Sequence, residues 1–117
     1  MPTRILIVDD HPSFRTSARR ILEEAGYDVV GEAADGESGL AAARSLRPAV
    51  VLLDVQLPDL DGFVVAQRLT RDDHAPAVVM TSSRDAGDFI GMVTRSGARG
   101  FVAKNELSGP ALDALVS

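Results

Sequence analysis

Five short, mostly apolar runs alternate with stretches of helical periodicity, and this alternation constrains the fold more than any other feature. The runs cover Arg4–Val8, Asp28–Ala33, Ala49–Leu53, Ala77–Met80 and Arg99–Ala103. Strands that are apolar on both faces are typical of a parallel sheet covered by helices on both sides. The more polar run, Asp28–Ala33, is typical of an edge strand. The chain therefore predicts an α/β fold with one doubly wound, five-stranded parallel sheet, flanked by five helices and joined by right-handed crossovers.

Helical spacing fills the intervals between these runs. An apolar stripe begins at Phe14, and Pro12 is suited to open this helix and Gly26 to end it. Further helices are predicted over Gly36–Leu46, Gly62–Leu69, the stretch from Asp85 to Gly97, and Pro110–Val116. In the fourth helix we expect Asp85 to be the N-cap and Met92 to belong to the packed stripe.

The composition is that of one ordinary globular domain. The chain has 117 residues, of which 45% are hydrophobic and 25% are charged. Its net charge of −5 argues against direct binding of nucleic acid, because domains that grip phosphate backbones usually present a basic face. The absence of cysteine excludes disulfides and thiolate metal sites. No apolar stretch approaches the roughly 18 residues that span a bilayer, so we expect a cytoplasmic location and no membrane contact.

Polar residues gather where the predicted strands end. Ligands of such sheets bind beyond the carboxyl ends of the strands. The residues at those ends are Asp9, Asp10, Asp54, Thr81 and Lys104. Neighbouring carboxylates repel, which raises a pKa unless a cation intervenes, and Mg²⁺ takes one or two carboxylates and reserves positions for phosphate oxygens. A carboxylate nucleophile, a hydroxyl and an ammonium together make up a phosphoryl-transfer site.

Each of these residues also has an ordinary structural interpretation. Aspartates often end strands and cap helices, and Asp9 could simply cap the helix near Pro12. Asp59 and Asp61 are better explained as turn and N-cap residues than as ligands, and His11 as a solvated loop residue. Lys104 would pass for a surface cation, except that it is the only lysine of the chain. Two acids on adjacent strand ends favour the metal site over these separate explanations.

Four segments together resemble a known family. They are Val8-Asp9-Asp10-His11-Pro12, Leu53 to Gly62, Val79-Met80-Thr81-Ser82 and Gly100-Phe101-Val102-Ala103-Lys104. In this order they resemble the receiver domain of bacterial two-component response regulators over residues 1–117. The opening Asp-Asp-His-Pro and the segment Ala34–Glu37 are similar to the LuxR/NarL-type subfamily, whose members often carry a helix-turn-helix after the receiver. The resemblance implies the flavodoxin-like strand order 2-1-3-4-5.

The resemblance also implies roles for single residues. Asp54 would be the phosphoacceptor. Asp10 would ligate Mg²⁺ directly and Asp9 would assist, partly through water. Asp54 and the backbone carbonyl of Gln56 would complete the protein's share of the metal ligands.

Three further residues would respond to the phosphoryl group. By the same resemblance, Thr81 would donate a hydrogen bond to it and Lys104 would form an ion pair with it. Phe101 would be the aromatic residue whose rotamer follows the state of Thr81. One position departs from the family pattern: Asn105 follows Lys104 where the family usually has proline, often after a cis bond. A cis bond before a non-proline residue costs about 3–4 kcal/mol, so either the site retains strain or the loop runs differently.

The implied function is a switch controlled by phosphorylation. A sensor histidine kinase or a histidine phosphotransfer protein would supply the phosphoryl group, and the chain would promote only its own phosphorylation and dephosphorylation. The face formed by the fourth helix, fifth strand and fifth helix would carry the output, including contact with a second copy. Three alternatives stay open: a receiver that docks partners without phosphate, the regulatory half of a DNA-binding regulator, and a Mg²⁺-dependent phosphatase. The phosphatase is disfavoured because Gln56 stands where its general acid would be.

Overall fold

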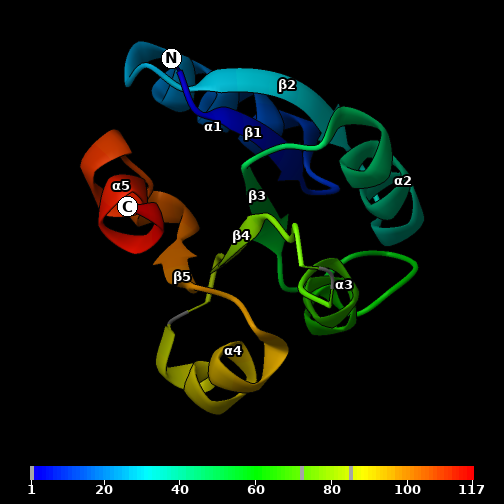
Figure 1. Ribbon diagram of the computed structural model, residues 1–117. Coiled ribbons are helices and arrows are strands. Elements are labelled where there is room, and N and C mark those ends of the chain that lie inside the picture. Colours follow the sequence, from blue (N-terminus) through cyan, green and yellow to red (C-terminus); the bar gives the residue numbers. More distant parts are fainter. Residues whose placement is uncertain (1, 72, 85) are drawn as a thin grey trace.

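The computed structural model describes residues 2–71, 73–84 and 86–117. Within these residues, parallel strands alternate with helices along the chain (Figure 1). The strands are β1 (Arg4–Val8), β2 (Asp28–Ala33), β3 (Val50–Asp54), β4 (Ala77–Ser82) and β5 (Gly100–Ala103). The helices are α1 (Pro12–Glu24), α2 (Gly36–Leu46), α3 (Gly62–Leu69), α4 (Ile90–Ser96) and α5 (Gly109–Val116), with 3₁₀ turns η1 (Ala86–Asp88) and η2 (Lys104–Glu106).

The sheet has the order β2-β1-β3-β4-β5, and every pairing is parallel. The predicted doubly wound fold and its strand order are therefore confirmed. Helices α1 and α5 cover one face and pack on residues such as Ile7 and Leu52. Helices α2, α3 and α4 cover the other face and pack on residues such as Leu6 and Leu53. This two-sided burial explains why the interiors of the central strands are apolar.

The local signals at the helix ends act largely as expected. Asp61 is the N-cap of α3 and accepts the Phe63 N–H at 2.7 Å. Asp59 accepts the N–H groups of Gly36 and Glu37, at the start of α2, which confirms its structural role. Gly26 and Gly97 take positive φ angles of 96° and 85° just beyond α1 and α4, where an L side chain would be strained.

Several predicted strand and helix bounds and the packing of one residue are wrong. Strand β3 runs over Val50–Asp54, one residue later than predicted, and β5 begins at Gly100. Strand β4 continues through Thr81 and Ser82, because both residues pair with β5. Met92 does not belong to a packed stripe: it is 46% exposed on the short helix α4. The predicted N-cap Asp85 lies outside the described residues, and α4 begins only at Ile90, after the 3₁₀ turn η1, so the fourth helix is shorter than predicted.

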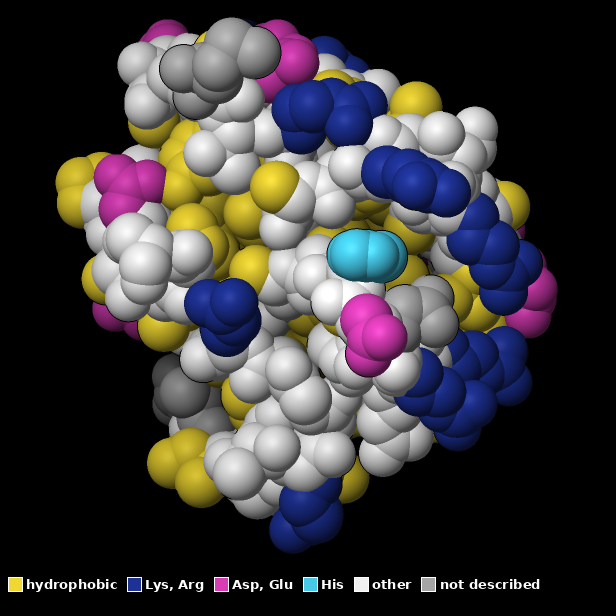
Figure 2. Space-filling model, viewed as in Figure 1, with side chains coloured by type: hydrophobic (Ala, Val, Ile, Leu, Met, Phe, Trp, Pro, Cys, Tyr) yellow, Lys and Arg dark blue, Asp and Glu magenta, His cyan; other side chains and the backbone are white. Residues whose placement is uncertain are grey.

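Basic side chains gather at the amino-terminal edge of the sheet. Figure 2, viewed as Figure 1, shows Lys and Arg side chains along the flank that carries α2. A shallow hollow on this edge is lined in part by Arg44, Arg47, Arg68 and Arg71. Arg44 and Arg68 lie in the last turns of α2 and α3, where a cation offsets the negative end of the helix dipole. No helix of the described chain is both long and apolar enough to cross a membrane.

Candidate metal and phosphoryl site

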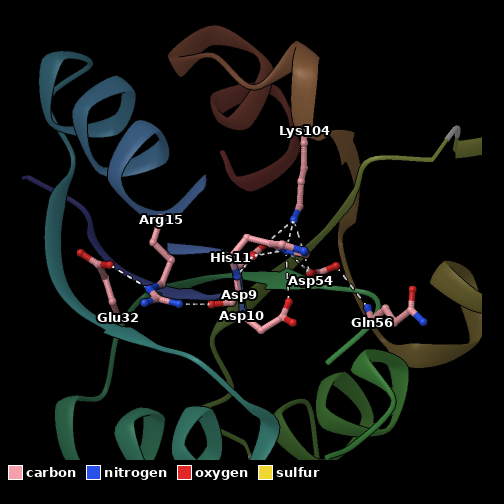
Figure 3. A network of polar contacts seen from close by, with 8 residues as sticks. All are labelled: Asp9, Asp10, His11, Arg15, Glu32, Asp54, Gln56 and Lys104. Carbon is pink, nitrogen blue, oxygen red and sulfur yellow. Dashed lines mark hydrogen bonds and ion pairs between the residues drawn. The ribbon is translucent and has the colours of Figure 1, made fainter. Parts of the chain in front are cut away.

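The opposite, carboxyl-terminal edge of the sheet brings the predicted site residues together. Asp9 and Asp10 directly follow β1, Asp54 ends the neighbouring strand β3, and Lys104 follows β5. Figure 3 shows their side chains converging above the strand ends, with the lysine reaching down onto the carboxylates. The sheet order explains this meeting, because β1 and β3 are adjacent and β5 lies two strands further on.

The carboxylates form a compact cluster in which the Asp10 side chain is 35% exposed. One side-chain oxygen each of Asp9, Asp10 and Asp54 and a ring nitrogen of His11 all lie within 4.8 Å of one another. Asp9 is fully buried and Asp54 is 4% exposed. Two buried oxygens of the described chain, Asp9 Oδ2 and Asp10 Oδ1, accept no hydrogen bond. The ammonium of Lys104 lies against Asp9 Oδ2, whereas Asp10 Oδ1 is left for a bound cation to compensate.

Lys104 supplies a positive charge to this cluster. Its Nζ lies 2.7 Å from Asp9 Oδ2 and 3.4 Å from Asp54 Oδ2. The ammonium also lies over the ring of Phe14, 4.6 Å from the centroid, and the side chain is only 14% exposed. A cation held between two carboxylates and an aromatic face is well placed to stay near the site.

The pKa of the Asp54 carboxyl is raised above its ordinary value. Burial raises the pKa of Asp54 most, because it disfavours the charged form. The Gln56 N–H, which donates to Asp54 Oδ1 at 3.1 Å, acts in the opposite direction on this pKa. The charge of Asp9 raises the pKa further, and Lys104 lowers it. The net pKa shift of Asp54 is upward, as the sequence predicted for at least one carboxylate of the cluster.

His11 takes part in the cluster, which the sequence analysis missed. Its side chain is 62% exposed, as expected in a loop, yet Nδ1 lies 3.1 Å from Asp9 Oδ1 and 3.2 Å from Asp10 Oδ1. Its backbone N–H donates to Asp9 Oδ1 at 2.8 Å. Only its position in the sequence, directly after Asp9 and Asp10, could have predicted this contact.

Thr81 and Phe101 lie on neighbouring strands beside Asp54. Thr81 pairs with Asp54 across β3 and β4, but its hydroxyl donates to the Val102 carbonyl at 2.7 Å. Phe101 is partly buried, and its ring centroid lies 5.9 Å from that of Phe89. The threonine is therefore next to the predicted phosphoacceptor, with its hydroxyl engaged by β5.

The chain accommodates Asn105 without a cis bond. None of the described peptide bonds is cis, and the residues Lys104–Glu106 form the 3₁₀ turn η2. The sequence left open either a strained cis bond or a different loop path, and the structure has the different path. Lys104 still reaches the carboxylates.

The donor set suits a small, hard divalent cation. Carboxylate oxygens predominate, the buried Asp10 Oδ1 accepts no hydrogen bond, and the site lies at the rim of the sheet, where phosphate oxygens and water can enter. Mg²⁺ requires few protein ligands and keeps several waters, which fits three converging acids better than a closed protein cage. The residues present therefore fit such an ion.

Comparison with known proteins places this geometry in context. The family model described as "Response regulator receiver domain" matches residues 5–115. The transcriptional regulatory protein AfsQ1 of Streptomyces coelicolor is 39% identical over 116 residues, which cover 99% of this chain and 50% of that protein. The response regulator GacA of Pseudomonas protegens is 37% identical over 102 residues, covering 86% of this chain and 48% of GacA. The chain thus spans about half the length of these relatives.

Solved structures agree with the sequence relatives. A two-component response regulator of the LuxR family from Aurantimonas sp. SI85-9A1 superimposes with a TM-score of 0.85 and 30% identity. The match covers 97% of this chain and 81% of that one. Both comparisons therefore lead to the same kind of domain.

Proposed function

The chain belongs to the response regulator receiver family, and on that premise we propose that Asp54 accepts a phosphoryl group in a signalling pathway. The observation that carries the proposal is the buried carboxylate of Asp54, adjacent to two further acids and to the ammonium of Lys104. We propose that residues 1–117 together form one receiver domain. The relatives are about twice as long, so what this domain controls is a proposal about a larger protein.

The proposed chemistry is transfer from a phosphohistidine of a sensor kinase or phosphotransfer protein. A carboxylate oxygen of Asp54 forms a new P–O bond while the P–N bond of the donor breaks. The electron pair of that bond returns to the imidazole nitrogen, and an aspartyl phosphate results. Water later cleaves the acyl phosphate and regenerates Asp54. The chain would promote only these two reactions on itself, and we propose no turnover of an external substrate.

Asp10, Asp9 and Asp54, with the backbone carbonyl of Gln56, would hold Mg²⁺. Bound there, the ion would offset the negative charge that three carboxylates and a phosphoryl group bring together. The support is the buried Asp10 Oδ1, which accepts no hydrogen bond, and the position of Gln56, whose N–H already contacts Asp54. His11 covers the same cluster from the loop side.

The switch would follow from charge added at Asp54. Three phosphoryl oxygens accept hydrogen bonds strongly, so Lys104 would move toward them, and the Thr81 hydroxyl would exchange the Val102 carbonyl for a phosphoryl oxygen. A rotation of Thr81 changes the space beside β5, which Phe101 would fill by a change of rotamer. The contact between Thr81 and Val102 supports this sequence, because it couples the threonine to the strand of Phe101.

A phosphate mimic tests the proposal directly. We expect beryllofluoride with Mg²⁺ to shift the backbone amide resonances of Thr81, Phe101 and Lys104, because all three would respond to a tetrahedral anion on Asp54. Heteronuclear NMR spectra with and without Mg²⁺ make the measurement. Shifts that are absent in both samples would refute the proposal in favour of a receiver that docks partners without phosphate.

The same sample tests the output face. Ile90 is 67% exposed and Met92 is 46% exposed on α4, beside β5. We propose that this apolar surface meets a second copy of the chain when Asp54 is modified. Sedimentation velocity should then show a dimer with beryllofluoride and a monomer without it, and Ile90→Asp should abolish the difference. A monomer under both conditions would contradict the self-association.

A further inference from the structure

Arg15 connects the acidic loop to the edge strand of the sheet. From the second turn of α1, its Nη1 donates to the backbone carbonyl of Asp9 at 2.6 Å. Its Nε donates to Glu32 Oε1 on β2 at 3.2 Å. The other oxygen of Glu32 accepts from Arg19 Nε at 2.7 Å. Figure 3 shows the chain of contacts from Glu32 through Arg15 to the loop that carries the carboxylates.

An irregularity in β2 makes this connection possible. Ile5 pairs with Val29, but the next residue, Leu6, pairs with Gly31, so one residue of β2 is extra. Side chains alternate along a strand, and an extra residue reverses the alternation beyond it. Glu32 therefore pairs with Ile7, whose side chain belongs to the face under α1, instead of facing α2. Bulges that re-aim a side chain are frequent beside functional sites.

The contact of Arg15 with Asp9 involves the peptide group that connects Asp9 to Asp10. The carbonyl of Asp9 belongs to the peptide unit that leads into Asp10. The N–H of Asp9 is already bound to the Ala33 carbonyl on β2 at 3.0 Å. With both backbone groups of Asp9 held, the direction in which the chain presents Asp10 is determined. A guanidinium can hold two acceptors at once in a fixed geometry, which an ammonium does less well.

We propose that Arg15, oriented by Glu32, is a positioning residue for the metal ligands Asp9 and Asp10. The inference rests on the proposed function, because it assumes that these carboxylates bind Mg²⁺. Arg15 touches neither the metal ligand atoms nor the phosphoacceptor. It acts through the peptide between the two aspartates, as partners of metal ligands do in other sites.

The chain provides a matched control in Arg19. Arg15 and Arg19 are arginines of the same helix, and each forms an ion pair with Glu32. Only Arg15 bonds the Asp9 carbonyl. If the ion pairs merely attached α1 to β2, removing either arginine would have the same consequence.

Titration calorimetry of Mg²⁺ binding to the whole chain separates the possibilities. We expect Arg15→Gln to weaken Mg²⁺ binding about ten-fold, the scale known for partners of metal ligands, and Arg19→Gln to change it less than about two-fold. Arg15→Lys should recover part of the loss, and it provides a second variant should Arg15→Gln fold poorly. Phosphorylation from acetyl phosphate adds a second measurement, in which Arg15→Gln should raise the Mg²⁺ concentration for half-maximal rate and leave the rate at saturating Mg²⁺ unchanged.

The outcomes distinguish this inference from the function on which it rests. A parent chain that binds no Mg²⁺ would refute the proposed function. Normal binding by the parent with equal effects of Arg15→Gln and Arg19→Gln would overturn the inference alone. A fall in the saturating rate without a change in Mg²⁺ affinity would also overturn it.

Discussion

Asp54→Asn is expected to abolish phosphorylation, with less than about one hundredth of the parent's incorporation from acetyl phosphate. An amide oxygen is a poor nucleophile toward phosphorus, and covalent catalysis of this kind depends on the carboxylate. The other acids do not substitute for it: Asp9 is fully buried beneath Lys104, and Asp10 would serve the metal. Mass spectrometry of the intact chain measures the covalent adduct.

The control is Asp59→Asn, in the loop that follows β3. Asp59 is exposed and bonds the first N–H groups of α2, so this variant should keep full phosphorylation. It should lose a little stability, because an amide accepts the N–H groups of Gly36 and Glu37 less strongly than a carboxylate does. An adduct that persists in Asp54→Asn would assign the phosphoacceptor to another residue.

Asp54→Asn should also stabilise the metal-free protein at neutral pH. The pKa of Asp54 is raised in the folded state, chiefly by burial, so the folded chain binds its proton more tightly than the unfolded chain does. Stability then falls as pH rises from the ordinary pKa of 3.8 through the raised value, and stays lower above it. Asparagine removes this dependence. Urea unfolding without Mg²⁺ should show the variant gaining on the parent over that interval, and parallel pH profiles would contradict the prediction.

The strand-end rule explains why the main part of the site could be predicted. The predicted strands Arg4–Val8 and Ala49–Leu53 were nearly continuous in apolar residues, so the acids that follow them stood out in the sequence. The sheet order then brings the ends of β1 and β3 side by side, with Asp9, Asp10 and Asp54 on them. Lys104 follows from the same rule at the end of β5. Only the topology had to be right for these four residues to meet.

The parts that were missed depend on single bonds that leave no periodic signal. The extra residue in β2 turns Glu32 toward α1, and no hydrophobic pattern announces that irregularity. The rotamer of a single side chain determines that the Thr81 hydroxyl donates to the Val102 carbonyl. Met92 lies on a helix of 7 residues, too short for a reliable stripe, and is exposed. All three features depend on tertiary contacts, which local sequence patterns do not encode.

Lys104→Met is expected to destabilise the metal-free chain by about 3 kcal/mol, the cost of leaving a buried charge without its partner. Lys104 Nζ lies 2.7 Å from Asp9 Oδ2, and Asp9 is fully buried. Without the ammonium, the negative charges of Asp9 and Asp54 repel each other. Methionine keeps most of the packing against Phe14, so the loss reports the charge. Urea unfolding at neutral pH measures it.

Two additions separate charge compensation from a general defect in Lys104→Met. Adding Asp9→Asn should recover much of the lost stability, because the uncompensated charge disappears. Saturating Mg²⁺ should recover more stability for Lys104→Met than it adds to the parent, because the ion would take over the role of the missing cation. If Mg²⁺ stabilised Lys104→Met and the parent equally, the ammonium and the ion would not share one electrostatic role.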